Sequence, residues 1–163
     1  MEIHKMVKDN WGAVAKIYKE GIDTHMATFE TKVPKYQDWD TSHLQIGRLV
    51  MVKEDKVLGW AALSPVSSRC VYGGVAEVSV YIGKEHRGLG IGKLLMRQLI
   101  LESEIAKIWT LQSGIFPDNI GSITLHKKMG FRYIGKRERI GKLKGVWKDN
   151  VLFERRSKII GIE

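Results

Sequence analysis

Residues 87–92, with the sequence RGLGIG, follow the alternating stretch AEVSVYIG and precede an amphipathic run. Glycine removes the side-chain obstruction at such a strand-to-helix junction and permits positive φ angles. The first turn of a helix carries unpaired backbone N–H groups and a partial positive charge. Together these features predict a binding site for phosphate, preferably pyrophosphate. Lys84, Arg87 and Lys93 flank the glycines and make the local field favourable for an anion.

Two common phosphate-binding patterns fail at this loop. The Walker pattern requires Ser or Thr after Gly-Lys, but Leu94 follows Gly92 and Lys93 here, and position 87 is not glycine. The dinucleotide pattern G-x-G-x-x-G fails because Lys93 stands where the third glycine belongs. A third pattern, [QR]-x-x-G-x-[GA], fits at every position from Arg87 to Gly92. A glycine-rich turn without a ligand is the alternative interpretation.

The histidines and the cysteine give no sign of a metal site or of a covalent nucleophile. The five histidines show no metal-ligand spacing, so the sequence predicts no metal site. Cys70 is the only cysteine and has no plausible base partner nearby, so we interpret it as a packing residue. No residue resembles a nucleophile that would carry an acyl group.

The elements that must position these residues follow from hydrophobic periodicity and turn signals. The pattern predicts an α+β chain of about seven strands and four helices. We expect strands over residues 2–8, 48–54, 56–66, 71–83, 107–116, 131–141 and 146–156, and helices over 11–21, 34–44, 89–104 and 119–130. In the first helix, Asp9 and Asn10 offer the N-cap and Gly21 the end. The last helix starts with an N-cap signal at Asp118 and Asn119 and ends on Gly130, a good C-cap.

Composition places the chain among globular proteins. It has 163 residues, of which 44% are apolar and 28% charged, and we expect one domain over residues 1–163. The net charge of +9 comes from scattered Lys and Arg, which favours a solvated basic surface over a nucleic-acid interface. No apolar run is long enough to cross a membrane. The polar N-terminus and the single cysteine lead us to expect a cytoplasmic protein.

The motif RGLGIG is the pyrophosphate loop of the GCN5-related N-acetyltransferase (GNAT) superfamily, which the chain resembles over nearly its whole length. The resemblance includes the strand AEVSVYIG and the helix segment NIGSITLHKKMGF. Within that superfamily the chain resembles the phosphinothricin and methionine sulfone (sulfoximine) acetyltransferases, through TFET at Thr28–Thr31, EVSVY, and GKLKGVWKDNVLFERR near the C-terminus. The resemblance implies the mostly antiparallel GNAT sheet flanked by helices, and acetyl-CoA as co-substrate.

The resemblance also implies which residues hold the cofactor. The strand that carries VYI separates from its neighbour in this fold, so that backbone groups are free for the pantetheine arm. A free N–H at Tyr81 or Ile82 would polarise the thioester carbonyl, and such a donor lowers a barrier by roughly 3–4 kcal/mol. The cofactor-binding residues implied are Val80, Tyr81, Ile82, Arg87, Gly88, Leu89, Gly90, Ile91, Gly92, Lys93, Asn119 and Ser122.

Two residues are candidates for proton transfer. The subgroup carries a glutamate at the position of Glu77, where a partly buried carboxylate could take the proton of an attacking amine directly or through water. The alternative is that Glu77 only pairs with a surface cation. His126 stands where many superfamily members have a tyrosine that protonates the departing thiolate, and an imidazole can donate at neutral pH. A packed, hydrogen-bonded histidine is the alternative.

The acceptor site is less defined by the sequence. The resemblance implies that Phe29, Glu30, Cys70, Val71, Tyr72 and Glu77 line it. Arg69 could hold a carboxylate, although nothing in the sequence fixes its direction. The subgroup has Asn where this chain has Met26, which leaves the amino-acid substrate open.

These features predict an acetyl-CoA-dependent N-acetyltransferase that acts on the α-amine of a small amino-acid-like acceptor, such as phosphinothricin, methionine sulfone or methionine sulfoximine, by direct attack in a ternary complex. Alternatives are acetylation of a protein or peptide N-terminus or of another small amine, and a non-catalytic acyl-CoA-binding module. The GVWKDN segment resembles the dimer-forming segment of the subgroup, so a homodimer is expected, with no nucleic acid or membrane as partner.

Overall fold

The seven strands form one mixed sheet in the order β1-β2-β3-β4-β5-β7-β6, in a computed structural model that describes all 163 residues. Every neighbouring pair is antiparallel except β4 and β5, which are parallel. The strands are β1 (Glu2–Lys5), β2 (Leu49–Lys53), β3 (Lys56–Pro65), β4 (Val75–Ile82), β5 (Thr110–Ile115), β6 (Arg132–Leu143) and β7 (Val146–Arg156). The helices are α1 (Trp11–Ile22), α2 (Tyr36–Ser42), α3 (Ile91–Ile105) and α4 (Ile120–Lys128). The predicted α+β class, with seven strands and four helices, is confirmed.

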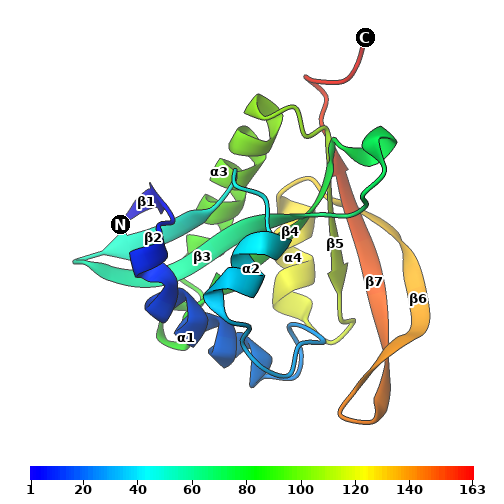
Figure 1. The fold of residues 1–163 in the computed structure, drawn as a ribbon. Coiled ribbons are helices and arrows are strands. Elements are labelled where there is room, and N and C mark those ends of the chain that lie inside the picture. The colour runs from blue at the N-terminus through cyan, green and yellow to red at the C-terminus, as the bar shows by residue number, and fades with distance from the viewer.

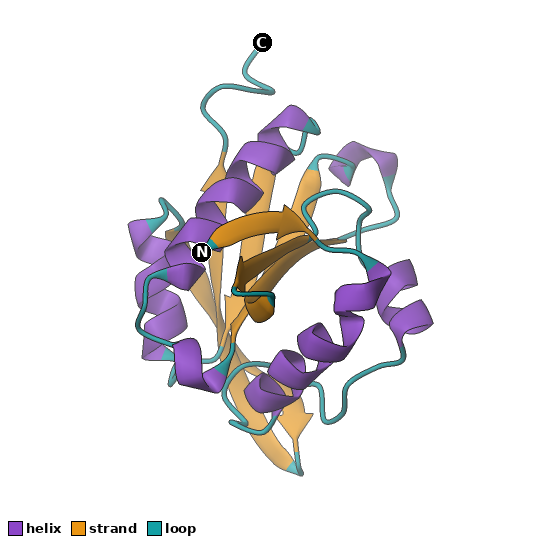
Figure 2. Ribbon diagram, turned by 90° about the vertical axis from the view of Figure 1, so that its left-hand side faces the viewer, coloured by secondary structure: helices purple, strands orange, loops and turns teal.

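Helices cover both faces of the sheet (Figure 2). On one face, α1 and α2 bury Val14, Ile17 and Trp39 against Val50 and Trp60 of the sheet. On the other, α3 supplies five residues to the larger core, which are Ile91, Leu95, Met96, Leu99 and Ile100. Leu94 of α3 is 39% exposed and lies outside this core. None of the helices has both the length and the apolar character that a membrane crossing requires.

The ends of the helices confirm two sequence predictions and correct two others. Asn119 caps α4 with its side chain, and Gly130 follows that helix at φ +85°. Asn10, by contrast, accepts the N–H of Val7 at 2.8 Å and makes no side-chain cap on α1. α1 continues one residue beyond Gly21, the predicted end, and a Cβ on Gly21 would come within 2.6 Å of the Tyr81 ring. This glycine is required for close packing of the helix on the sheet.

The parallel pair β4 and β5 separates after a short start. Their pairing covers Val75 with Thr110 through Glu77 with Gln112, whereas β4 continues to Ile82. Along its other edge, β4 stays paired with β3 up to the pair formed by Ile82 of β4 and Gly59 of β3. In Figure 1, β2 and β3 run across the view while β5 and β7 run nearly down it. The sheet therefore opens between β4 and β5, as the family resemblance implied.

Candidate active site

The opening between β4 and β5 leaves backbone groups of β4 without a strand partner. The N–H of Gly83 donates to Leu58 of β3 at 2.8 Å. Because successive backbone groups of a strand point to opposite edges, the N–H of Tyr81 also faces β3, and those of Val80 and Ile82 face the opening. Of the two predicted thioester donors, Tyr81 and Ile82, this alternation favours Ile82. The Ile82 carbonyl already accepts Arg87 Nε from that side at 3.4 Å.

The glycine loop follows directly, and two of its glycines have backbone conformations that favour glycine. Gly88 and Gly90 both have φ +78°, and a Cβ on either would meet no atom within 4 Å. Gly90 is the N-cap residue of α3, so the N–H groups of the first helical turn lie at the same place. Arg87 and Lys93 are exposed beside them. The loop is thus an open concavity of backbone donors flanked by cations, which suits pyrophosphate.

The third glycine of the loop has a different role. A Cβ on Gly92 would lie 3.2 Å from Leu125 Cδ2, so Gly92 allows α3 and α4 to approach closely. The Ile91 side chain is 1% exposed and belongs to the core, which leaves only its backbone for a ligand. Leu89, by contrast, is 58% exposed at the mouth of the loop.

Asn119 and Ser122 hold α4 and the loop after α1 in place. Asn119 Oδ1 accepts the N–H of Ser122 at 3.2 Å, and Asn119 Nδ2 donates to the carbonyl of Met26, also at 3.2 Å. Both polar ends of the Asn119 side chain are therefore already bonded within the protein. Contact of these two residues with the cofactor remains a prediction.

Glu77 lies on the face of β4 that α1 covers, at the last pair before the strands separate. Ala76 and Val78, its neighbours, point to the opposite face and enter the core. Gln112 of β5 stands opposite Glu77, with Nε2 at 3.5 Å from Glu77 Oε2. Glu77 is exposed, not partly buried as expected, and it forms none of the ion pairs of the structure. Its carboxylate is thus free to meet a solvent-borne amine, and pairing with a surface cation is not observed.

Two phenols stand farther along the same face of the sheet. Tyr18 and Tyr81 have ring centroids 4.9 Å apart. Burial raises the pKa of Tyr18 to about 12, and the nearby Glu30 charge adds to this while the Thr28 hydroxyl opposes it. Burial also raises the pKa of Tyr81, and to a higher value than that of Tyr18. The charges of Tyr18, Glu30 and Glu77 add to this increase. Both phenols therefore stay protonated near neutral pH and can donate hydrogen bonds.

His126 belongs to α4 and is buried against Phe131, the residue before β6. Its Nδ1–H donates to the Ser122 carbonyl at 2.7 Å, and its ring packs edge-on against Phe131 at 4.9 Å. Nε2 is buried without a hydrogen-bond partner. Burial lowers the pKa of His126, only partly offset by the bond to Ser122, so the ring is neutral near pH 7. A neutral ring with its hydrogen on Nδ1 has no proton at Nε2, which favours the packing alternative; proton donation remains a prediction.

We expect His126 to make stability dependent on pH. Because its folded pKa lies below the unfolded value of about 6.5, the unfolded chain binds more protons as pH falls through that value. The free energy of unfolding should therefore decrease from about pH 8 to pH 5, and His126→Gln should flatten this slope. Urea unfolding across that range measures it. His4→Gln, at an exposed position, is the control, and an unchanged slope in His126→Gln would contradict the expectation.

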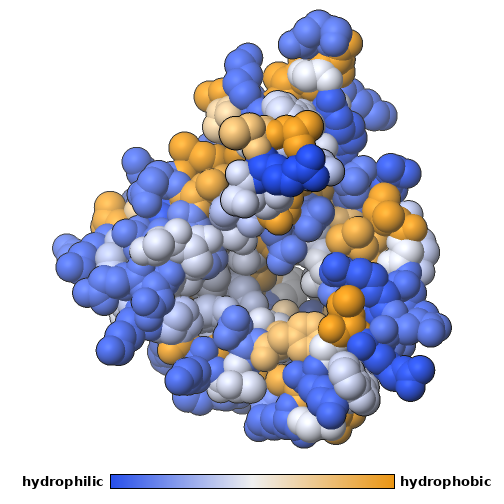
Figure 3. Space-filling view, turned by 45° about the vertical axis from the view of Figure 1, so that its right-hand side comes forward, coloured by the Kyte–Doolittle hydropathy of each residue, from blue (hydrophilic) through white to orange (hydrophobic).

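The residues predicted for the acceptor site lie in two separate places. Phe29 packs against Phe116 at 4.8 Å and against Gly141 of β6, so the loop after α1 closes over the sheet near the β6–β7 hairpin. Cys70–Tyr72 form an exposed turn of 3-10 helix at the start of β4. Figure 1 shows that turn at the upper right, well away from the loop between α1 and α2 at the bottom. The two groups of residues therefore do not form one cluster. The face of the molecule drawn in Figure 3 has a hollow near its centre.

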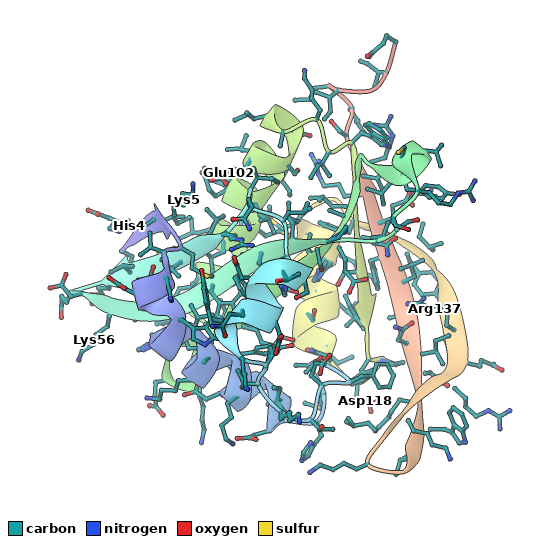
Figure 4. The ribbon with its side chains drawn as sticks, in the orientation of Figure 1. His4, Lys5, Lys56, Glu102, Asp118 and Arg137 are labelled. Atoms are coloured by element: carbon teal, nitrogen blue, oxygen red, sulfur yellow. The ribbon has the colours of Figure 1, made fainter.

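Sequence reasoning missed a set of polar residues on the same face of the sheet. Gln112 stands beside Glu77, and Arg137 of β6 donates through Nε to Asn150 Oδ1 of β7 at 2.8 Å. Figure 4 labels Arg137 on β6. Nothing in the sequence distinguished Arg137 from the other scattered basic residues, because its position depends on strand pairing. No group of three or more His, Cys, Asp or Glu side chains could hold a metal ion.

The sequence of this chain is similar to a known protein family and to several characterised enzymes. Residues 14–131 match the family model described as Acetyltransferase (GNAT) family. The chain is 26% identical to phosphinothricin N-acetyltransferase of Streptomyces coelicolor, with 95% of each chain covered. It is 28% identical to an L-methionine sulfoximine/L-methionine sulfone acetyltransferase of Pseudomonas paraeruginosa, with 83% of each covered.

Solved structures agree with the fold. The crystal structure of ribosomal-protein-alanine N-acetyltransferase from Brucella melitensis has a TM-score of 0.88 at 26% identity, covering 96% of this chain and 100% of that one. A phosphinothricin acetyltransferase from Sinorhizobium meliloti, solved in complex with acetyl-CoA, has a TM-score of 0.85 at 27% identity, covering 95% and 87%.

Proposed function

This chain belongs to the acetyltransferase (GNAT) family, and we propose that it acetylates the α-amine of a small amino-acid-like molecule. It is an N-acetyltransferase, and acetyl-CoA is its co-substrate. Phosphinothricin, methionine sulfone and methionine sulfoximine are the first candidates for the acceptor, because relatives with these activities match most of the chain. The observation that carries the proposal is the exposed Glu77 carboxylate at the point where β4 and β5 separate.

The chain's own residues fit acetyl-CoA. The pyrophosphate would lie against the N–H groups of Gly88–Lys93, where Gly88 and Gly90 leave open space. The backbone edges of Val80 and Ile82 face the opening and would pair with the pantetheine arm. The Ile82 N–H would donate to the thioester oxygen, where negative charge develops during attack.

Transfer then needs no covalent enzyme intermediate. The acceptor nitrogen attacks the thioester carbonyl carbon, the C–N bond forms and the C–S bond breaks. The nitrogen gives up a proton as the amide forms, and the departing thiolate takes up one proton to leave as the free thiol of coenzyme A. An α-amine titrates near about 8, so below that pH a proton must leave it before attack. Glu77 would accept this proton directly or through water. The Gln112 amide, 3.5 Å from Glu77 Oε2, would orient the carboxylate.

An acceptor panel tests the proposal. Thiol release from acetyl-CoA is measured with phosphinothricin, methionine sulfone, methionine sulfoximine, a peptide with N-terminal alanine, and spermidine. We expect turnover with at least one of the three amino acids, and a higher kcat/KM for it than for the peptide or the polyamine. Acetyl-CoA binding without turnover on any amine would instead identify an acyl-CoA-binding module.

Acetylation of a protein N-terminus is the second candidate. It is favoured by the similarity to ribosomal-protein-alanine N-acetyltransferase. A protein acceptor needs an open groove for several residues, whereas Phe29 packs against Phe116 and Gly141 over the sheet. We therefore place the small acceptor first, and the peptide arm of the panel distinguishes the two. The reaction is proposed to take place in the cytoplasm, where the free thiol of Cys70 would stay reduced.

The β6–β7 hairpin is proposed as a homodimer interface. Ile140, Val146 and Trp147 are 50%, 58% and 54% exposed, and the segment resembles the dimer-forming segment of the subgroup. Light scattering should give the mass of two 18.6 kDa chains, and Trp147→Glu should reduce it to one. A wild-type protein that stays monomeric at high concentration would contradict this.

A further inference from the structure

Arg137 has no carboxylate partner, in contrast to three other arginines of the structure. Arg48 pairs with Asp40, Arg132 with Glu154 at 3.2 Å and Arg155 with Glu104 at 3.0 Å. Arg137 has no such pair, and its only side-chain hydrogen bond runs from Nε to Asn150 Oδ1. Asn150 is 8% exposed, so this bond fixes the guanidinium on a rigid partner. The Nη groups remain as free donors.

Gly114 of β5 creates the space in which this guanidinium lies. A Cβ at Gly114 would fall 3.2 Å from Arg137 Nη2 and 2.6 Å from Asn150 Nδ2. Leu111 and Ile115 point into the core on the far side of the sheet, so Gly114 and Gln112 face the side of α1. Arg137 thus reaches from β6 across β7 to β5, on the face that carries Glu77.

The separation between Glu77 and Gly114, the residue over which Arg137 lies, suits an α-amino acid. Glu77 stands opposite Gln112 on the neighbouring strand, about 5 Å away, and Gly114 lies about 7 Å farther along β5, so the backbone positions of Glu77 and Gly114 are about 8 Å apart. The amine and carboxylate of an α-amino acid are about 3 Å apart, and a hydrogen bond of about 2.8 Å at each end gives a span of roughly 8–9 Å. The two lengths are of the same order, with the negative group of the enzyme at one end and the positive group at the other.

We infer that Arg137, held by Asn150 over Gly114, binds the α-carboxylate of the acceptor while Glu77 receives its amine. The inference rests on the proposed function and deepens it, because it names the group that selects α-amino acids over simple amines. A planar guanidinium donates two parallel hydrogen bonds to a carboxylate, which fixes the orientation of the acceptor. Arg137 is a specificity residue in this assignment and takes no part in proton transfer.

The test compares each amino-acid acceptor with its carboxamide, which keeps the α-amine and loses the charge. Wild-type enzyme should prefer the acid. In Arg137→Met, kcat/KM for the acid should fall about 10- to 50-fold, mainly through KM, while the carboxamide changes less than about twofold. Arg137→Lys should restore part of the preference, because lysine keeps the charge without the paired donors.

Arg132→Met is the matched control, since Arg132 lies on the same strand and pairs with Glu154. It should leave the ratio of acid to carboxamide unchanged. Equal losses on acid and carboxamide in Arg137→Met would overturn the inference, as would a loss of preference in Arg69→Met that Arg137→Met does not share. Failure of the wild-type enzyme to acetylate any of the amino acids overturns the proposed function as well, so the two failures can be told apart.

Discussion

Glu77→Gln should lower kcat by about 100- to 1,000-fold at neutral pH, which is the range for removal of a general base. The substitution keeps the shape and the position opposite Gln112 but cannot accept a proton. Because an α-amine titrates near about 8, the loss should be greatest below that pH and should shrink above it, where free amine is abundant. A pH profile of thiol release with saturating acetyl-CoA measures this.

Glu102→Gln is the control for the change of charge. Glu102, labelled in Figure 4, lies on α3 outside the opening between β4 and β5. Its carboxylate accepts the N–H of Gly47 at 3.2 Å. Its variant should keep the wild-type rate at every pH. A Glu77→Gln profile parallel to that of the wild type would remove Glu77 from the role of base and leave it as a surface carboxylate.

Gly90→Ala should raise KM for acetyl-CoA about 30- to 100-fold, because hydrogen bonds to a charged group each contribute about 1.5–3 kcal/mol. Alanine is strained at φ +78°, and its Cβ would project into the space that the pyrophosphate needs. The first N–H groups of α3 would then be displaced from the phosphate oxygens. Steady-state kinetics and calorimetric titration with coenzyme A measure the effect.

Gly130→Ala separates backbone strain from loss of the binding site. Gly130 has φ +85° after α4, and its nearest contact for a Cβ is Arg155 Nε at 3.9 Å. Both variants should unfold at lower temperature, but only Gly90→Ala should bind coenzyme A more weakly. Equal affinity of Gly90→Ala and wild type for coenzyme A would contradict the phosphate-binding role of the loop.

Local patterns in the sequence were sufficient to propose the parts of the site that lie on one continuous segment. Glu77, the VYI strand and the glycine loop succeed one another along residues 76–95, so their order and spacing already predict the proposed base, a strand edge and a phosphate-binding turn. Asn119 and Gly130 were likewise readable, because helix caps depend only on nearby residues.

Packing decided what the local patterns could not. The sequence predicted that Gly21 ends a helix and that Gly92 lies in the phosphate-binding loop. The structure adds that each permits close contact with a side chain distant in the sequence, Tyr81 and Leu125. His126 looks equally suited to donate a proton or to pack, and only its burial against Phe131 makes it neutral. These properties depend on neighbours from other elements, which no local periodicity specifies.

The sequence by itself therefore determined the cofactor, since the motif that binds it is local and its chemistry resides in the backbone. The proposal that Arg137 belongs to the acceptor end of the site rests on the tertiary structure. Arg137 and Glu77 are 60 residues apart in sequence, and the pairing of β4 with β5, β5 with β7 and β7 with β6 brings them to one face. Strand order arises from long-range pairing, and that is the physical reason Arg137 could not be identified from the sequence.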